Sequence, residues 1–130
     1  MRTILIRTVC ISTITPMPMM KADVQPAPLV LHLPWPPSVN HYWRRVGNKT
    51  ILSREGREYR KKIAEDIGLQ CQRETIGVSV PLRVQITAYP PDRRRRDLDN
   101  ILKSLLDALQ HAGVYVDDSQ INDLSIHRVP

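Results

Sequence analysis

The chain of 130 residues has no phenylalanine, only two cysteines and no long apolar run. Without phenylalanine, leucine, isoleucine and valine are expected to fill the hydrophobic core. Cys10 and Cys71 lie far apart in unlike contexts, which argues against a disulfide framework or a cysteine metal pair and favours a reduced, cytosolic protein. No apolar stretch approaches the ~20 residues of a membrane-spanning helix, so no membrane partner is expected.

What the chain does contain is basic and moderately apolar. Hydrophobic residues make up 42%, the formal net charge is +6 and the pI is about 9.7. This length and composition suit one compact domain, and a dimer interface would add to its limited core. The positive charge favours a polyanionic partner, with nucleic acid ahead of a membrane surface, although charge alone leaves that choice open.

Residues 1–28 differ from the remainder, because they are rich in threonine and proline and show no lasting periodicity. We expect a disordered extension there, or a start codon assigned too early, since Met17, Met19 and Met20 are alternatives. A secretory signal is disfavoured because Arg7 interrupts the apolar stretch and no small-residue cleavage site follows. The domain proper is therefore expected over residues 29–130.

Strand-like and helix-like patterns alternate along that domain, which predicts a single α/β domain with a mixed sheet and two main helices. Ser53 is placed to cap the first helix and Gly113 to end the second. The proline-rich stretch PWPPSVNHYW, residues 34–43, is expected to be a loop without helix. The expected strands are 29–33, 49–52, 82–88 and 124–129, and the expected helices are 54–70 and about 98–111.

The most informative segment is DRRRRDLDNILK, residues 92–103. Arginine forks fit phosphate oxygens, whereas carboxylates repel them unless a divalent cation lies between. Asp97 and Asp99 stand in this basic surround, so we expect them to hold Mg²⁺, which takes oxygen ligands from one or two carboxylates plus substrate phosphate. The expected phosphate-binding residues are Arg93, Arg94, Arg95, Arg96 and Lys103.

Two further features extend this candidate site. Lys103 follows Asp99 by four residues on one shoulder of the apolar stripe, where it can neutralise phosphate charge or orient an attacking water. Asp117 and Asp118 supply further carboxylates. One of them would complete the metal site if the chain after Gly113 returns beside the start of the helix.

Each feature also has an ordinary structural explanation. Asp97 can be a helix N-cap, and Asp99 a first-turn acid favoured by the helix dipole. Asp99 and Lys103 can form an i,i+4 ion pair worth about 0.3–0.5 kcal/mol. The arginines can be a solvated loop, and Asp117 with Asp118 a turn. These explanations account for the features singly but not for their convergence.

Other candidates are weaker. Trp35, Tyr42 and Trp43 can stack on unpaired bases, but core or dimer contacts are the more common use of such side chains. No histidine pair has metal-ligand spacing, and no Ser-His-Asp or Cys-His arrangement can be proposed. There is also no glycine-rich phosphate loop.

Three segments together resemble the RusA family of crossover junction endodeoxyribonucleases. They are LPWPPSVNHYWR at 33–44, PDRRRRDLDNILKSLLDAL at 91–109 and AGVYVDDSQI at 112–121, and the resemblance covers about residues 29–129. It implies a homodimeric α/β resolvase of DNA recombination and repair, often of prophage origin, which cuts four-way (Holliday) junctions by paired, Mg²⁺-dependent incisions. The implied metal ligands are Asp97, Asp99 and Asp118, and the implied catalytic lysine is Lys103.

The chain also departs from the family pattern. Residues 1–28 are additional, and relatives usually continue beyond the position of Pro130 through another hairpin strand. A truncated prophage remnant that binds branched DNA without cutting it is therefore one alternative. A basic RNA-binding protein is the second alternative.

Overall fold

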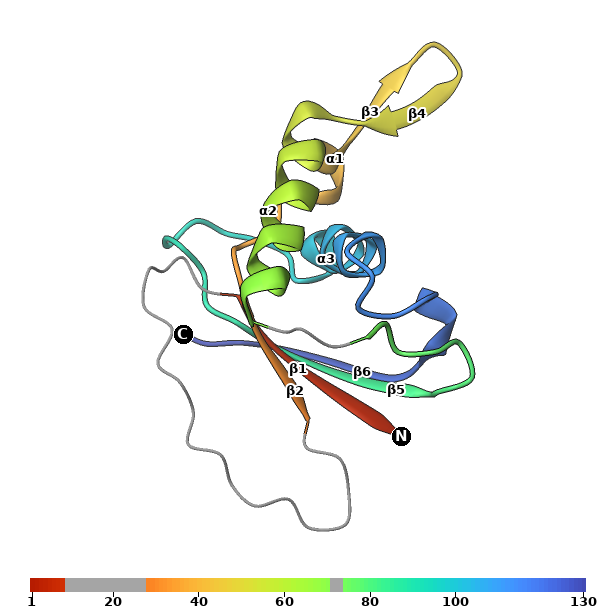
Figure 1. Cartoon of the computed structure of the whole chain (residues 1–130). Helices are drawn as coiled ribbons and strands as arrows, with labels where there is room; N and C mark the ends of the chain where they lie inside the picture. Colours follow the sequence, from red (N-terminus) through yellow and green to blue (C-terminus); the bar gives the residue numbers. More distant parts are fainter. Residues whose placement is uncertain (9–27, 71–73) are drawn as a thin grey trace.

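The computed structural model describes residues 1–8, 28–70 and 74–130, and it shows an α/β arrangement in which helices cover one face of a sheet (Figure 1). The sheet has four parallel strands in the order β2-β1-β5-β6, and a separate antiparallel ribbon is formed by β3 and β4. Parallel and antiparallel pairing thus occur in two sheets. The strands are β1 (Arg2–Thr8), β2 (Leu29–Leu33), β3 (Trp43–Val46), β4 (Lys49–Leu52), β5 (Leu82–Ala88) and β6 (Ile121–Arg128).

Two long helices and two short helical turns complete the domain. The expected α/β class with two main helices is confirmed, and none of the helices in the described ranges is long and apolar enough to cross a membrane. The helices are α1 (Val39–Tyr42), α2 (Arg54–Gln70), α3 (Asp99–His111) and the 3₁₀ turn η1 (Asp118–Gln120).

The expectation of a disordered N-terminal extension is wrong for Arg2–Thr8, which forms β1 between β2 and β5. Ile4 and Ile6 are 0% and 1% exposed and belong to the core. The physical reason is tertiary, because a strand in the middle of a parallel sheet gains both hydrogen-bond ladders from distant segments. Residues 9–27 lie outside the described residues, so the rest of that prediction stays a prediction.

The core lies between the sheet and the helices. Along β5 the residues Leu82, Val84, Ile86 and Ala88 are buried and alternate with more exposed polar ones, as the period of a strand requires. Aliphatic residues dominate this core as expected. Three tyrosines also enter it, of which only Tyr42 was considered as a core residue from the sequence: Tyr42, Tyr59 and Tyr115.

Helix α2 begins as predicted, because the Ser53 hydroxyl accepts a hydrogen bond from the Gly56 amide at 3.0 Å. Gly56 is also required by packing, since a Cβ there would lie 2.4 Å from the carbonyl oxygen of Tyr42. The stretch before α2 is not wholly loop as predicted, because Val39–Tyr42 forms one helical turn. Proline restricts its own φ and the preceding residue, so the chain is free to turn after Pro37 and Ser38.

Helix α3 ends at the glycine that the sequence indicated. Gly113 has φ of 81°, its amide donates to the carbonyl of Gln110 at 3.1 Å, and the Val114 amide donates to that of Leu109 at 3.1 Å. This is the Schellman pattern of a left-handed helix end. It turns the chain back toward the sheet, where Val114 and Tyr115 are buried.

A polar cluster joins α1, α2 and α3. Asp107 of α3 accepts hydrogen bonds from the Tyr42 hydroxyl and from Nη2 of Arg60 at 2.7 Å, while Nε of Arg60 lies 2.8 Å from the Tyr42 oxygen. Burial, followed by the bond to Asp107, raises the pKa of Tyr42 far above its ordinary value, so the hydroxyl stays a donor. The cluster fixes α1 and α3 relative to each other, which positions the segments described next.

Candidate nucleic-acid interface and metal site

The candidate site lies beyond the carboxyl ends of β2 and β5, the usual ligand position in an open parallel sheet. The segments that leave these two strands line a groove of about 480 Å³, here called the arginine groove. Its walls come from the proline-rich segment, the arginine loop and the start of α3. Its lining includes Trp35, Ser38, Arg94, Arg95, Arg96, Asp97 and Asn100.

The four arginines are not equivalent. Arg93, Arg94 and Arg95 are exposed, whereas the side chain of Arg96 is 21% exposed and binds both oxygens of Asp92, at 2.5 and 2.8 Å. Arg96 also stacks over the ring of Trp35, 5.6 Å from its centroid. Arg96 therefore shapes the loop, and three arginines remain to face a ligand.

Asp92 holds the arginine loop together by accepting hydrogen bonds from two of its residues. The hydrogen bond from Arg96, followed by one from the Arg94 amide at 2.9 Å, holds the pKa of Asp92 well below its usual value. The carboxylate thus stays ionised and keeps the loop closed around itself. Arg94 lies 3.7 Å from the same carboxylate, so it is partly neutralised.

Asp97 and Asp99 flank Leu98, the N-cap residue of α3. The N-cap is Leu98 and makes no side-chain cap bond, so Asp97 is not the cap that its position suggested. Both carboxylates are exposed, and Asp97 has one weak contact, from Nδ2 of Asn100 at 3.4 Å. In the described part of the chain no ion pair joins Asp99 to Lys103 or to another cation. The two acids are therefore available to bind a cation.

Lys103 faces a second groove, on the other side of α1. This ribbon groove, of about 650 Å³, is lined by α1, by the β3–β4 ribbon and by Lys103. Asn100, three residues before Lys103 in α3, lines the arginine groove instead. The start of α3 thus separates the two grooves. The lining residues of the ribbon groove are Val39, Asn40, Trp43, Arg44, Arg45, Thr50 and Lys103.

Asp117 and Asp118 have different surroundings. Asp117 caps η1, since its carboxylate accepts from the Ser119 amide at 2.8 Å, and this bond lowers the pKa of Asp117. Asp118 lies 2.6 Å from the hydroxyl of Tyr115, which is also 2.8 Å from the carbonyl of Leu106. Burial, followed by Asp118, raises the pKa of Tyr115, which keeps its proton for these acceptors.

The structure does not bring the three expected metal ligands together. No group of three or more His, Cys, Asp or Glu residues in the described ranges is placed to hold a metal ion. The Tyr115 hydroxyl bridges Asp118 and the carbonyl oxygen of Leu106 in the second half of α3.

The remaining donor set still fits a hard divalent cation. Asp97 and Asp99 are exposed carboxylates without a cationic partner among the described residues, and they adjoin the arginine groove. Mg²⁺ commonly binds to one or two carboxylates together with substrate phosphate oxygens and water. An ion held by Asp97, Asp99 and Asp118 therefore stays a prediction.

Sequence reasoning did not single out Asn100 or the pair Arg44 and Arg45 as parts of a site. Asn100 lines the arginine groove, and the two arginines line the ribbon groove. Adjacent arginines beside a short strand were the available indication. Of the aromatic residues, Tyr42 is a core residue with 0% exposure, whereas Trp43 and Trp35 are half-buried.

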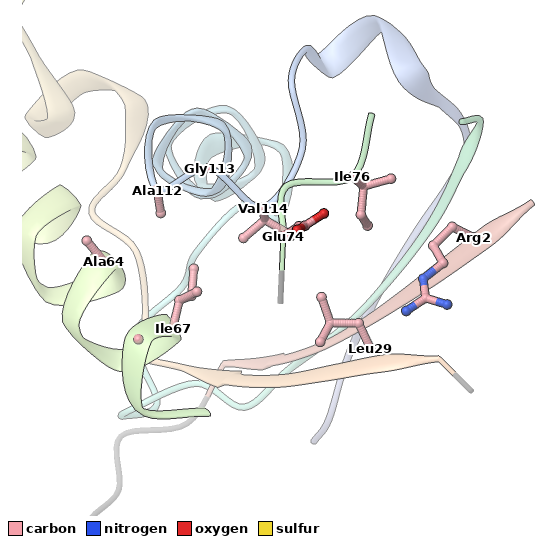
Figure 2. A pocket seen from close by; sticks show the side chains of 10 residues that line it. Arg2, Leu29, Ala64, Ile67, Glu74, Ile76, Ala112, Gly113 and Val114 are labelled. Carbon is pink, nitrogen blue, oxygen red and sulfur yellow. The ribbon is translucent and has the colours of Figure 1, made fainter. Parts of the chain in front are cut away.

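A cavity of about 230 Å³ lies at the opposite, amino-terminal end of the sheet (Figure 2). Arg2 and Leu29, which begin β1 and β2, contribute to it together with residues from α2 and the end of α3. Its lining is mostly aliphatic, and Figure 2 shows Arg2 and Glu74 among those side chains. The position and lining of this cavity do not suit a phosphodiester site.

An exposed basic loop lies at the carboxyl edge of a parallel sheet, beside two exposed acids that have no cationic partner among the described residues; this combination is typical of a nuclease-like α/β domain. Comparison with known proteins identifies the particular class, because residues 34–130 match the family model described as Endodeoxyribonuclease RusA. The chain belongs to the RusA family. The expected family membership is thereby confirmed over about three quarters of the chain.

Similar proteins carry the corresponding name. The chain is 43% identical over 98 residues to the crossover junction endodeoxyribonuclease rusA of Enterobacteria phage 82, which covers 75% of this chain and 80% of that protein. It is 47% identical over 96 residues to that of Enterobacteria phage HK97, covering 74% of this chain and 78% of that protein. The protein of the same name from Shigella sonnei is 42% identical over 98 residues, covering 75% and 80%.

Proposed function

We propose that this protein is an endodeoxyribonuclease that cuts crossover, or four-way, DNA junctions in recombination and repair. The observation that carries this proposal is the pair Asp97 and Asp99, which is exposed, lacks a cationic partner in the described ranges and stands beside three exposed arginines. Membership of a family named for this activity supports it. The RNA-binding alternative has no such support.

In this proposal the chain contributes binding, orientation and charge. Arg93, Arg94 and Arg95 bind backbone phosphates, a contact that is sensitive to salt and largely independent of sequence. Asp97 and Asp99 would hold Mg²⁺, which when bound polarises the phosphoryl group and lowers the pKa of a water. Lys103, four residues after Asp99 in α3, offsets charge on the phosphate.

The protein is also proposed to act as a homodimer, with Asp118 taking part in the reaction. A homodimer fits the task, because two-fold symmetry matches two symmetric incisions in a junction. Asp118 is retained as a family-implied participant, although Tyr115 holds it beside the second half of α3. The proposal needs only Asp97 and Asp99 as direct ligands.

The test is incubation of the protein with a labelled mobile four-way junction in Mg²⁺ or in chelator. Paired symmetric nicks are expected only with the metal. Asp99→Asn, which keeps the shape but removes the charge, should lower the cleavage rate by on the order of 10²–10³-fold and leave junction binding in chelator intact. Thermal unfolding should not change, because Asp99 makes no bond in the described structure that the substitution would break.

The controls separate the alternatives. Lys61→Ala, on an exposed part of α2, should cleave like the wild type. Wild-type protein that binds the junction but never cuts it would favour the binding-only alternative. Equal binding to junction, duplex and single-stranded RNA at matched salt would favour the RNA-binding alternative. Cleavage that survives Asp99→Asn at full rate would contradict the metal assignment.

A further inference from the structure

The β3–β4 ribbon, which lines the ribbon groove, projects from the body of the domain (Figure 1). Residues 43–52, WRRVGNKTIL, contain three basic side chains and no acidic one. Arg44, Arg45 and Lys49 are exposed, and in the described ranges none of them belongs to an ion pair. The ribbon is therefore a small uncompensated positive arm.

The strand register distributes this charge over both faces of the arm. Arg45 pairs with Thr50 on the face that carries half-buried Trp43 and Leu52, which pack against the core. Arg44 pairs with Ile51, and Val46 with Lys49, on the opposite face. Because side chains alternate between faces, each face presents at least one cation.

The ribbon lies close to the proposed metal site, because it shares a groove with a residue of α3. Arg44, Arg45 and Lys103 line the same groove. Helix α1 lies between this groove and the arginine groove and contributes residues to both. Asp97 and Asn100 face the arginine groove, whereas Lys103, one turn further along α3, faces the ribbon groove. Positive side chains therefore line both grooves, on either side of the two acids at the start of α3.

The outer face argues for DNA over a second copy of this chain. Val46 and Ile51 are 46% and 40% exposed between Arg44 and Lys49. A symmetric pairing of two such faces would bring like charges together, which is unfavourable. The major groove of B-DNA admits a two-stranded β-ribbon, and phosphates line both of its edges.

We propose that the β3–β4 ribbon is a second DNA-binding element, which places Arg44, Arg45 and Lys49 against the phosphates of a duplex arm beside the cut strand. This inference rests on the proposed function, because it assigns a further contact to the same branched substrate. The arginine loop and the ribbon then hold two parts of the junction, with Asp97 and Asp99 between them.

The test measures the affinity for a labelled four-way junction in chelator over a series of salt concentrations. The double variant Arg44→Ala with Arg45→Ala should bind about tenfold more weakly at low salt. The slope of log affinity against log salt should be less steep by about 1.8, because each phosphate contact contributes about 0.9. Cleavage with Mg²⁺ at saturating protein should be affected much less than binding.

A matched control is Lys61→Ala with Lys62→Ala, which removes the same charge from α2 and should keep the wild-type slope. Arg44→Lys with Arg45→Lys keeps the charge and should restore most of the slope. An unchanged unfolding midpoint of the alanine variant is expected, because neither arginine is buried. Light scattering should show the same oligomeric state for all variants.

A wild-type slope for the alanine variant, in a protein that cuts junctions normally, would overturn the ribbon assignment alone. A changed oligomeric state with an unchanged slope would also overturn it and would make the ribbon a protein interface. If the wild-type protein neither prefers nor cuts junctions, the proposed function itself fails. A changed slope on all nucleic acids alike would then show the ribbon to be a general polyanion contact and would overturn the junction-specific assignment.

Discussion

The acidic residues beside the start of α3 and those beside its second half have opposite surroundings. At the start, Asp97 and Asp99 are exposed and have no cationic partner in the described structure. Near the end, Asp107 is tied to Tyr42 and Arg60, and Asp118 to Tyr115. The difference teaches that sequence spacing cannot separate acids that stabilise the fold from acids that are free to bind a ligand, whereas their partners can.

The largest effect on stability is expected from Asp107→Ala. The substitution leaves the Tyr42 hydroxyl and the Arg60 guanidinium without their acceptor, in a cluster where the acid and arginine side chains are 28% and 23% exposed. The free energy of unfolding should fall by about 2–3 kcal/mol. Denaturant unfolding measures it, with Asp99→Ala as the matched control that should stay close to the wild type. An equal loss of unfolding free energy in Asp107→Ala and Asp99→Ala would contradict the conclusion that only Asp107 stabilises the fold.

Tyr115→Phe tests whether Asp118 takes part in the reaction or only stabilises the fold. Loss of the hydroxyl should lower the free energy of unfolding by about 1 kcal/mol. If Asp118 takes part in the reaction, loss of its hydrogen-bond partner should slow junction cleavage by about 10–100-fold, with partial recovery at higher Mg²⁺. We expect this slower cleavage. An unchanged rate would place Asp118 with the structural acids.

The smallest effect is expected from Asp117→Asn. Because the pKa of this acid is lowered by its bonds to Ser119, its ionised form stabilises the protein above the ordinary pKa, and that stabilisation is lost as pH falls through the lowered value. The variant should unfold slightly earlier than the wild type at neutral pH, and the gap should close in acid. Junction cleavage at neutral pH should be unchanged. A large loss of cleavage would indicate that Asp117, and not Asp118, takes part in the reaction.

Local patterns predicted much of the fold. The bounds of 29–33, 54–70 and 82–88 agree with β2, α2 and β5, since alternation, helical length and Ser53 are encoded within each segment. Strand β1 was missed because its order depends on pairing with two distant strands. The residues of the arginine loop were identified, but the engagement of Arg96 with Asp92 and Trp35 required the folded loop.

The placement of Asp118 could not be predicted for a related reason. Its place depends on a hydrogen bond from Tyr115, whose burial is set by the turn at Gly113 and by packing on the sheet. Spacing along the chain carries no information on that contact. The family resemblance indicated which acids matter but not how one chain arranges them.

The position of β1 has a consequence for translation initiation. A ribosome that began at Met17, Met19 or Met20 would make a chain that still contains every arginine and aspartate of the candidate site. That shorter product would lack the strand to which both β2 and β5 are hydrogen-bonded, so its sheet would be divided in the middle. Residues 2–8 therefore form a structural element on which the sheet behind the candidate site depends.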